Sequence, residues 1–229
     1  MLLLGISILP VLLLLLYIYK QDKYEKEPLK LLILAFFGGI LSIGLDLILV
    51  SLINNYWYSD TVFYSAFMEA GFPEELSKFI ILFLFFWWNK NFNEYMDGIV
   101  YATFVSLGFA CIENILYVFG GGIGTGIMRA IISVPGHFLF GVLMGYFLSL
   151  AKFTPNKKLF YILLSIIVPG LVHGLFDWLL MITDEVGTFG QLVILALFII
   201  GDVFLWIAGV RSIRKHRENS QFKNIQPNV

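Results

Sequence analysis

Among the ionisable side chains within otherwise apolar segments, seven are candidates for acid–base chemistry. They are Glu74, Glu75, Lys78, Glu113, His137, His173 and Asp177. Glutamate and histidine are common general acids and bases, and both are also ligands of catalytic zinc. These residues are therefore the candidates for a functional site.

Helical spacing relates several of these side chains to one another. Glu74 and Lys78 are four residues apart with the acid first, which is the favourable order for an ion pair. His173 and Asp177 share a helix face by the same rule, so Asp177 can orient the imidazole. Glu75 is turned about 100° from Glu74, so the two need not point the same way. The spacing predicts that Lys78 neutralises Glu74 and that Asp177 orients His173.

The composition places these groups in a membrane protein. Of the 229 residues, 59% are hydrophobic and 14% are charged, whereas a soluble domain is about a quarter charged. A charged side chain at the centre of a membrane helix costs roughly 2.5–3.5 kcal/mol, so the chain must pair these groups or use them. The net charge of −1 indicates no nucleic-acid partner, and the single Cys111 excludes an intramolecular disulfide.

The elements that must position the site are transmembrane helices, each of which needs about 20 apolar residues. We predict an all-α, polytopic bundle of about seven such helices, at 2–19, 31–53, 62–88, 98–119, 128–150, 159–182 and 189–210. The first segment has no basic leader and no small-residue cleavage site, so we interpret it as a span rather than a secretory signal. Gly71 and Pro73 interrupt the third segment, which we expect to begin at the interface and to turn into the membrane near Pro73.

The basic residues predict an orientation. All lysines and arginines except Lys78 and Arg129 fall in alternate connections or in the tail, and the other connections have none. Because basic residues concentrate on the cytoplasmic side, the N-terminus is expected outside and the C-terminus inside. We predict a single integral membrane domain over 1–210 and a short basic cytoplasmic tail over 211–229, which we expect to be disordered.

The predicted topology brings the candidate residues to one depth. Glu113, His137 and His173 fall about 9–14 Å below the outer boundary, and tilt could bring Glu74 and Glu75 to a similar level. Helix breakers precede three of the groups, namely Gly71 with Pro73, Pro135 with Gly136, and Pro169 with Gly170. We therefore expect broken helices that line a water-filled pocket.

The glycine-rich connection 120–126 could be mistaken for a phosphate-binding loop. It lacks the Lys-Ser/Thr pair of such a loop and follows no strand, so a flexible turn is predicted.

Several segments together resemble the PrsW family of intramembrane proteases. They are Glu74-Glu75-x-x-Lys78, Asp97-Gly98, Gly108-Phe109-Ala110-x-x-Glu113-Asn114, His137 and His173-Gly174-x-x-Asp177. The resemblance covers about residues 69–182, and the other spans agree only in hydropathy. That family is similar in turn to the CAAX prenyl endopeptidase and bacteriocin-processing superfamily. This chain departs from the superfamily pattern at Glu113, where the superfamily has histidine.

The resemblance implies a multi-pass protease of the bacterial cell membrane. It implies the first (site-1) cut in a membrane-anchored anti-sigma factor of a stress-response cascade, near the extracytoplasmic face. The expected partners are thus a single-span membrane substrate and the lipid bilayer, with no nucleic acid. Glu74, Glu75 and His173 match the essential positions of the family, Glu113 and His137 match further positions, and Asn114 has a supporting place.

Two mechanisms fit these residues. In the favoured glutamic mechanism, Glu74 or Glu75 is the general base, and His173, oriented by Asp177, stabilises the oxyanion or protonates the leaving nitrogen. No cofactor is then expected. In the alternative, His137, His173 and a glutamate such as Glu113 bind Zn²⁺. The i, i+4 histidine pair of the usual zinc helix is missing, which favours the glutamic mechanism.

Two other classes of function stay open at this point. A proton-coupled transporter or channel would also place carboxylates, a lysine and histidines at mid-depth. Such proteins usually have a doubled architecture, and no internal repeat is evident in this chain. The other is an inactive membrane scaffold, which the complete set of acid, base and orienting residues disfavours.

Overall fold

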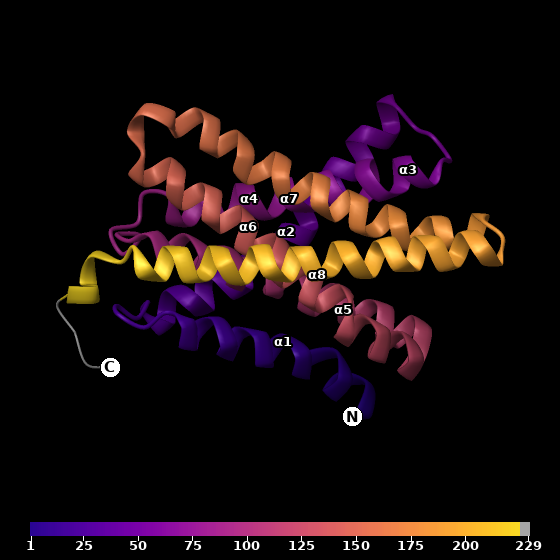
Figure 1. The fold of residues 1–229 in the computed structure, drawn as a ribbon, viewed down its shortest axis with the longest axis horizontal. Helices are drawn as coiled ribbons and strands as arrows, with labels where there is room; N and C mark the ends of the chain where they lie inside the picture. Colours follow the sequence, from indigo (N-terminus) through magenta and orange to yellow (C-terminus); the bar gives the residue numbers. More distant parts are fainter. Residues whose placement is uncertain (225–229) are drawn as a thin grey trace.

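The computed structural model describes residues 1–224, and within that range every regular element is a helix. Several of the long helices run lengthwise through the molecule (Figure 1), and the helical content confirms the predicted all-α bundle. The elements are α1 (Leu2–Gln21), α2 (Leu29–Tyr56), α3 (Val62–Tyr64), the π-helix η1 (Ser65–Gly71), α4 (Phe72–Phe86), α5 (Tyr95–Ile131), α6 (Ser133–Phe153), η2 (Pro155–Lys157), α7 (Lys158–Met181), η3 (Ile182–Glu185), α8 (Thr188–Glu218) and η4 (Gln221–Asn224).

Five helical stretches of the described chain are long and apolar enough to cross a membrane. They are α1, α2, the combined stretch of α5 and α6, the stretch Pro155–Met181, and α8. A polytopic membrane protein is therefore confirmed. The predicted count is about seven for two reasons. It treats α5 and α6 as two spans, and it includes the third predicted segment, whose helix α4 has only 15 residues. That count and the orientation of the termini remain predictions.

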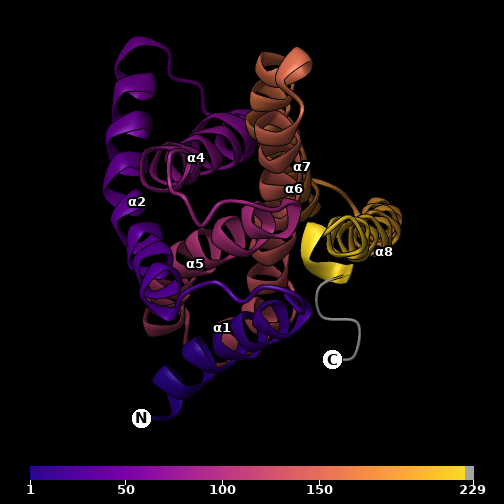
Figure 2. The ribbon, with the colours of Figure 1, turned by 90° about the vertical axis from the view of Figure 1, so that its left-hand side faces the viewer.

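Helix α5 is the central element of the bundle. Every residue from Met96 to Cys111 is buried, because α1, α2, α4, α6 and α8 all contact this helix. Figure 2 shows α5 enclosed between α1, α2, α4 and α6. A helix that is apolar all round belongs in such an interior. By contrast, α1, α2 and α8 expose many leucine, isoleucine and phenylalanine side chains, as is expected of helices that face lipid chains.

The expected breaks next to the site are wrong, because the helices continue through them. Residues 62–86 run from α3 through the π-helix η1 into α4 without a non-helical residue. The wider i→i+5 bonding of a π-helix, seen in the bond from the Phe72 N–H to the Phe67 carbonyl, absorbs the irregularity before Pro73. Pro135 lies in the first turn of α6, where a missing N–H costs little. Pro169 lies inside α7, which continues past it.

Glycines let η1 and α7 approach closely. A Cβ atom added to Gly71 would lie 2.6 Å from the backbone nitrogen of Gly174 and 2.9 Å from the carbonyl oxygen of Gly170. Only residues without a side chain permit backbones this close. This contact holds the start of α4, which carries Glu74 and Glu75, against the part of α7 that carries His173.

Gly122 reverses the chain within the residues assigned to α5. Its backbone has φ of 78°, which favours glycine. In a straight helix, residues 113 and 129 would be about 24 Å apart, yet Nη2 of Arg129 lies 2.9 Å from Oε1 of Glu113. The predicted turn at 120–126 is therefore confined to one residue, with helix on both sides.

The described part of the tail is ordered, so the expectation of disorder from residue 211 onward is wrong there. Helix α8 continues to Glu218. His216 is fully buried, and its Nε2 donates to the carbonyl oxygen of Tyr146 at 3.1 Å. The tail therefore packs against α6, and residues 225–229 lie outside the described range.

The contact between η1 and α7 generates the first prediction. We expect Gly71→Ala to lower the thermal unfolding midpoint of the protein in detergent, because the added methyl group must push two backbones apart. Overpacking of this kind costs about 1–3 kcal/mol. Gly44→Ala on α2 is the matched control, since nothing lies within 4 Å of a Cβ atom there. Equal midpoints for the two variants would contradict the proposed packing.

Candidate active site

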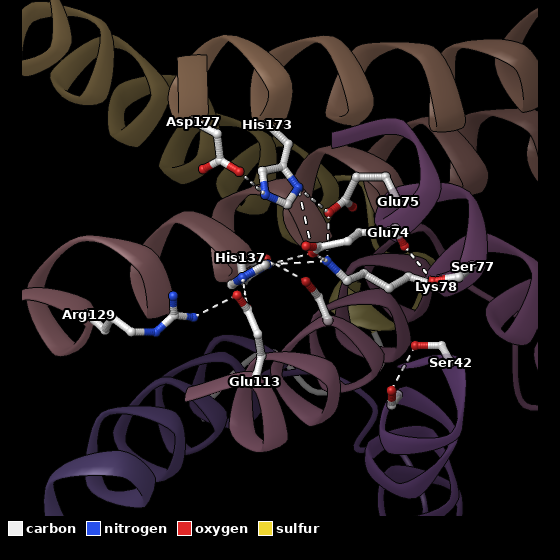
Figure 3. A network of polar contacts seen from close by, with 12 residues as sticks. Ser42, Glu74, Glu75, Ser77, Lys78, Glu113, Arg129, His137, His173 and Asp177 are labelled. Carbon is white, nitrogen blue, oxygen red and sulfur yellow. Dashed lines mark hydrogen bonds and ion pairs between the residues drawn. The ribbon is translucent and has the colours of Figure 1, made fainter. Parts of the chain in front are cut away.

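The structure brings all seven candidate residues into one polar network inside the bundle (Figure 3). The first turns of α4 carry Glu74, Glu75 and Lys78. The other members come from three helices, with Glu113 on α5, His137 on α6, and His173 with Asp177 on α7. The residues that were expected to lie at one depth are therefore in contact within a single network.

The buried ammonium group of Lys78 lies at the centre of the network. Its Nζ is 2.8 Å from Oε1 of Glu75 and 3.1 Å from Oε2 of Glu74. It is also 3.2 Å from Nδ1 of His137 and 4.1 Å from the centre of the Phe109 ring. The Lys78 side chain is completely buried, so its charge depends on these partners. Lys78 thus pairs with both glutamates, where the spacing predicted a pair with Glu74 alone.

The contacts of His137 fix its neutral tautomer. The Lys78 ammonium can only donate, so Nδ1 of His137 accepts. The other ring nitrogen, Nε2, therefore carries the proton and donates to Oε2 of Glu113 at 2.7 Å. The backbone carbonyl of His137 accepts from the Ser106 hydroxyl at 2.6 Å, which holds α6 against α5.

The contacts of His173 favour the positively charged imidazolium. Its Nδ1 is 3.1 Å from Oε1 of Glu75, and its Nε2 is 3.3 Å from Oδ2 of Asp177. Both nitrogens thus face carboxylate oxygens, and both can donate only when the ring carries two protons. The ring also stacks on Phe140, with a centroid distance of 4.5 Å. The predicted orientation of His173 by Asp177 agrees with this geometry.

Glu74 and Glu75 differ in their access to the cavity. The Glu75 side chain is completely buried, whereas that of Glu74 is 11% exposed. Oε2 of Glu74 lies 3.9 Å from Nδ1 of His173 and 4.0 Å from Nδ1 of His137. Within the described residues, only Lys78 donates to the Glu74 carboxylate. Glu74 is therefore the glutamate of this pair that a substrate or a water molecule can reach.

Two adjoining cavities meet at the site. One, of about 220 Å³, is lined by Glu74, Glu113, Arg129, His137, His173 and Asp177 among others. The second, of about 480 Å³, extends toward Asp46 of α2 and Glu69 of η1. Both are lined by Ala70, Glu74, Glu113, Tyr117 and Met181. The two cavities thus adjoin along a groove at Glu74, where a substrate can approach the carboxylate.

Arg129 is the site residue that the sequence did not assign. Its guanidinium pairs with Glu113 and lies 4.2 Å from the centre of the Tyr117 ring. Asn114 accepts from Nε of Arg129 and donates to the carbonyl of Ser7, so it supports Arg129 and is not itself in the cavity lining. The sequence did contain a signal for Arg129. It and Lys78 are the two basic residues that lie outside the charged connections and the tail, and both belong to the network.

The comparisons with known proteins agree with this site. A family model described as PrsW family intramembrane metalloprotease matches residues 27–204. The proteins named Protease PrsW from Geobacillus kaustophilus, Bacillus subtilis and Oceanobacillus iheyensis are 33%, 34% and 36% identical to this chain. The alignments cover 98%, 92% and 95% of this chain and 96%, 94% and 97% of the relatives. No solved structure matches the chain.

Of the three functions that the sequence left open, these relatives support the protease. The family match includes every candidate site residue, and the relatives align over nearly their whole length. The chain therefore belongs to the PrsW family and is an intramembrane protease.

Proposed function

We propose that this protease is of the glutamic type and that Glu74 is its general base. The observation that carries the proposal is the difference between the two adjacent glutamates. Glu74 lines both cavities, whereas the completely buried Glu75 lines neither. A general base must reach the proton that it removes, and Glu74 meets this condition.

The proposed reaction begins with a water molecule beside Glu74. The carboxylate takes one proton while the water oxygen bonds to the scissile carbonyl carbon, which gives a tetrahedral oxyanion. The imidazolium of His173 and the guanidinium of Arg129 both line the cavity, and their charges stabilise the oxyanion. The C–N bond then breaks, and the leaving nitrogen takes the proton from Glu74. The products are a carboxylic acid and an amine.

Glu75, Asp177 and Glu113 act as positioning residues in this proposal. Glu75 and Asp177 hold the ring of His173 from its two sides. Glu113 joins His137 to Arg129. The three acids keep the cationic groups in place without contacting the substrate carbonyl themselves.

The zinc alternative requires a different arrangement of the same residues. Glu74, Glu75, His137 and His173 each offer an atom within 4.8 Å of the others, and two histidines with a carboxylate form a known zinc set. The ammonium of Lys78, however, lies among them and donates to both glutamates and to His137. Both nitrogens of His173 also donate to carboxylates. Because Lys78 lies where a zinc ion would have to bind, this arrangement supports the glutamic mechanism.

We propose a single-span membrane protein as substrate. The groove beside Glu74 supports an extended, locally unwound segment, because a peptide bond inside a helix is shielded by its own hydrogen bonds. The family resemblance implies an anti-sigma factor as the first candidate, cut near the extracytoplasmic face. The bilayer then acts as the medium that delivers the substrate helix to the groove.

The two glutamates should respond differently to substitution. We expect Glu74→Gln to lower cleavage about 10²–10⁴-fold, the usual contribution of a general base, and to lower the thermal unfolding midpoint less than Glu75→Gln does, because Glu74 is partly exposed to the cavity. Glu75→Gln should lower that midpoint, because breaking a buried pair costs about 3–5 kcal/mol. The assay is cleavage of a panel of single-span substrates in liposomes, with the midpoints measured in detergent.

The controls for this assay separate the two roles. Wild-type protein must cut at least one member of the panel, and Asp60→Asn, an exposed position, should behave like wild type. Undiminished cleavage by Glu74→Gln would refute the assignment. If only Glu75→Gln abolished cleavage, at an unchanged unfolding midpoint, the base would be Glu75.

Removal of transition metals gives an independent test. We expect cleavage by the wild-type protein to be unchanged in 1,10-phenanthroline, which removes Zn²⁺ but leaves Ca²⁺ and Mg²⁺ in place. The physical reason is that Lys78 already supplies the positive charge between the site carboxylates. Loss of cleavage that added Zn²⁺ restores would show that Lys78 leaves the centre and that a metal replaces it.

A further inference from the structure

A second group of acidic side chains lies at the opposite end of the bundle from the protease site. The connection between α1 and α2 contributes Asp22, Glu25 and Glu27, and the start of α5 with its preceding connection contributes Asn93 and Asp97. These five residues are called here the acidic cluster. Asp97 and Glu113 are 16 residues apart on α5, so the cluster lies about 24 Å from the protease site.

The carboxylates of the acidic cluster are close together and mostly buried. Glu25, Glu27 and Asp97 each offer an oxygen atom within 4.8 Å of the others. Asp22 and Asp97 are 0% exposed, and Glu27 is 3% exposed. Acids this close repel one another, and their burial removes most of the screening that water would provide.

Three of these acids use one oxygen to hold the fold together. Oδ2 of Asp97 accepts from the backbone N–H groups of Asn93 and Glu94 at 2.8 and 2.7 Å. Oε2 of Glu27 accepts from the Tyr101 hydroxyl. Oδ2 of Asp22 accepts from the backbone N–H of Glu27 at 3.3 Å. These bonds fix the positions and directions of the carboxylates.

When these acids are ionised, the second oxygen of each is buried and has no donor among the described residues. The atoms are Oδ1 of Asp22, Oε1 of Glu27 and Oδ1 of Asp97. Oε2 of Glu25 and Oδ1 of Asn93 are buried without a partner as well. Buried polar atoms normally have a partner, so each exception requires an explanation. Because Glu25, Glu27 and Asp97 lie within reach of one ion, their unpaired oxygens indicate a shared partner.

The neighbouring lysines do not supply that partner. The ammonium of Lys26 donates to the carbonyl of Tyr19 and lies over its ring. The ammonium of Lys152 donates to the carbonyl of Trp87 at 2.7 Å and lies over the Phe92 ring. The contrast with the protease site is direct, because Lys78 makes hydrogen bonds to its acids there.

We propose that the acidic cluster is a binding site for a hard divalent cation, Ca²⁺ or Mg²⁺. Glu25, Glu27 and Asp97 supply carboxylate oxygens, and Asn93, whose side chain contacts Glu25, supplies an amide oxygen. Carboxylate and amide oxygens without nitrogen or sulfur ligands are the set that these ions prefer. The ion joins the α1–α2 connection to the start of α5, and so stabilises the central helix at the end remote from catalysis.

The test measures ion binding by the full-length protein in detergent, after treatment with EDTA and removal of the chelator. Ca²⁺ and Mg²⁺ are titrated separately, and both the heat of binding and the thermal unfolding midpoint are recorded. We expect one of the ions to raise the midpoint by roughly 5–10 °C at a hundredfold excess over its Kd. Which ion does so identifies the natural ligand.

Matched variants locate the ion. Glu25→Gln and Glu27→Gln should each weaken binding at least tenfold. Glu25 is the safer of the two for folding because its side chain is only partly buried. Asp60→Asn, an exposed acid in the α2–α3 connection, and Glu74→Gln, in the protease site, should bind like wild type.

Three results would overturn the proposal. They are no midpoint shift with either ion in wild-type protein, a full shift in both cluster variants, or a shift abolished by Glu74→Gln. The first would mean that the acids share protons among themselves. Since the readouts are binding and stability, the result does not depend on whether the proposed protease mechanism is correct.

Discussion

The buried ammonium group of Lys78 is the contact on which the arrangement of the protease site depends. It pairs with Glu74 and Glu75 and fixes the tautomer of His137. Four carboxylates gather around two histidines in an apolar interior, and they would repel one another without this cation. Lys78 also leaves Oε1 of Glu74 free of donors among the described residues. Lys78 thus compensates the charge of the two glutamates and still leaves one oxygen of Glu74 accessible to a water molecule.

Close backbone contacts bring the partners of Lys78 together. Gly71 and Gly174 let η1 lie against α7, which places His173 beside Glu75. Gly122 returns the chain so that Arg129 reaches Glu113. These glycines carry no chemistry themselves. They allow charged groups from helices far apart in the sequence to meet at hydrogen-bond distance, which a bundle of larger residues would prevent.

Two positions along α5 illustrate two ways of keeping acids inside a protein. Near Glu113 the acids are paired with the cations Lys78, Arg129 and His173, and the neutral His137 donates a hydrogen bond to Glu113. Near Asp97 the carboxylates direct one oxygen into the fold, and the other is left without a donor among the described residues. The first arrangement suits catalysis, because protons can move among its members. The second suits a fixed cation that stabilises the helix.

Much of this protein follows from its sequence. The apolar segments determined the membrane helices, and the ionisable residues within them determined the members of the site, because burying such groups is too costly without a use. Spacing along one helix determined the pairing of His173 with Asp177. Tertiary structure alone decided that Glu74 rather than Glu75 faces the cavity, that Lys78 touches His137, and that Arg129 returns to Glu113. Helical spacing fixes only relative directions on one helix, whereas these contacts depend on how separate helices pack and where the chain reverses.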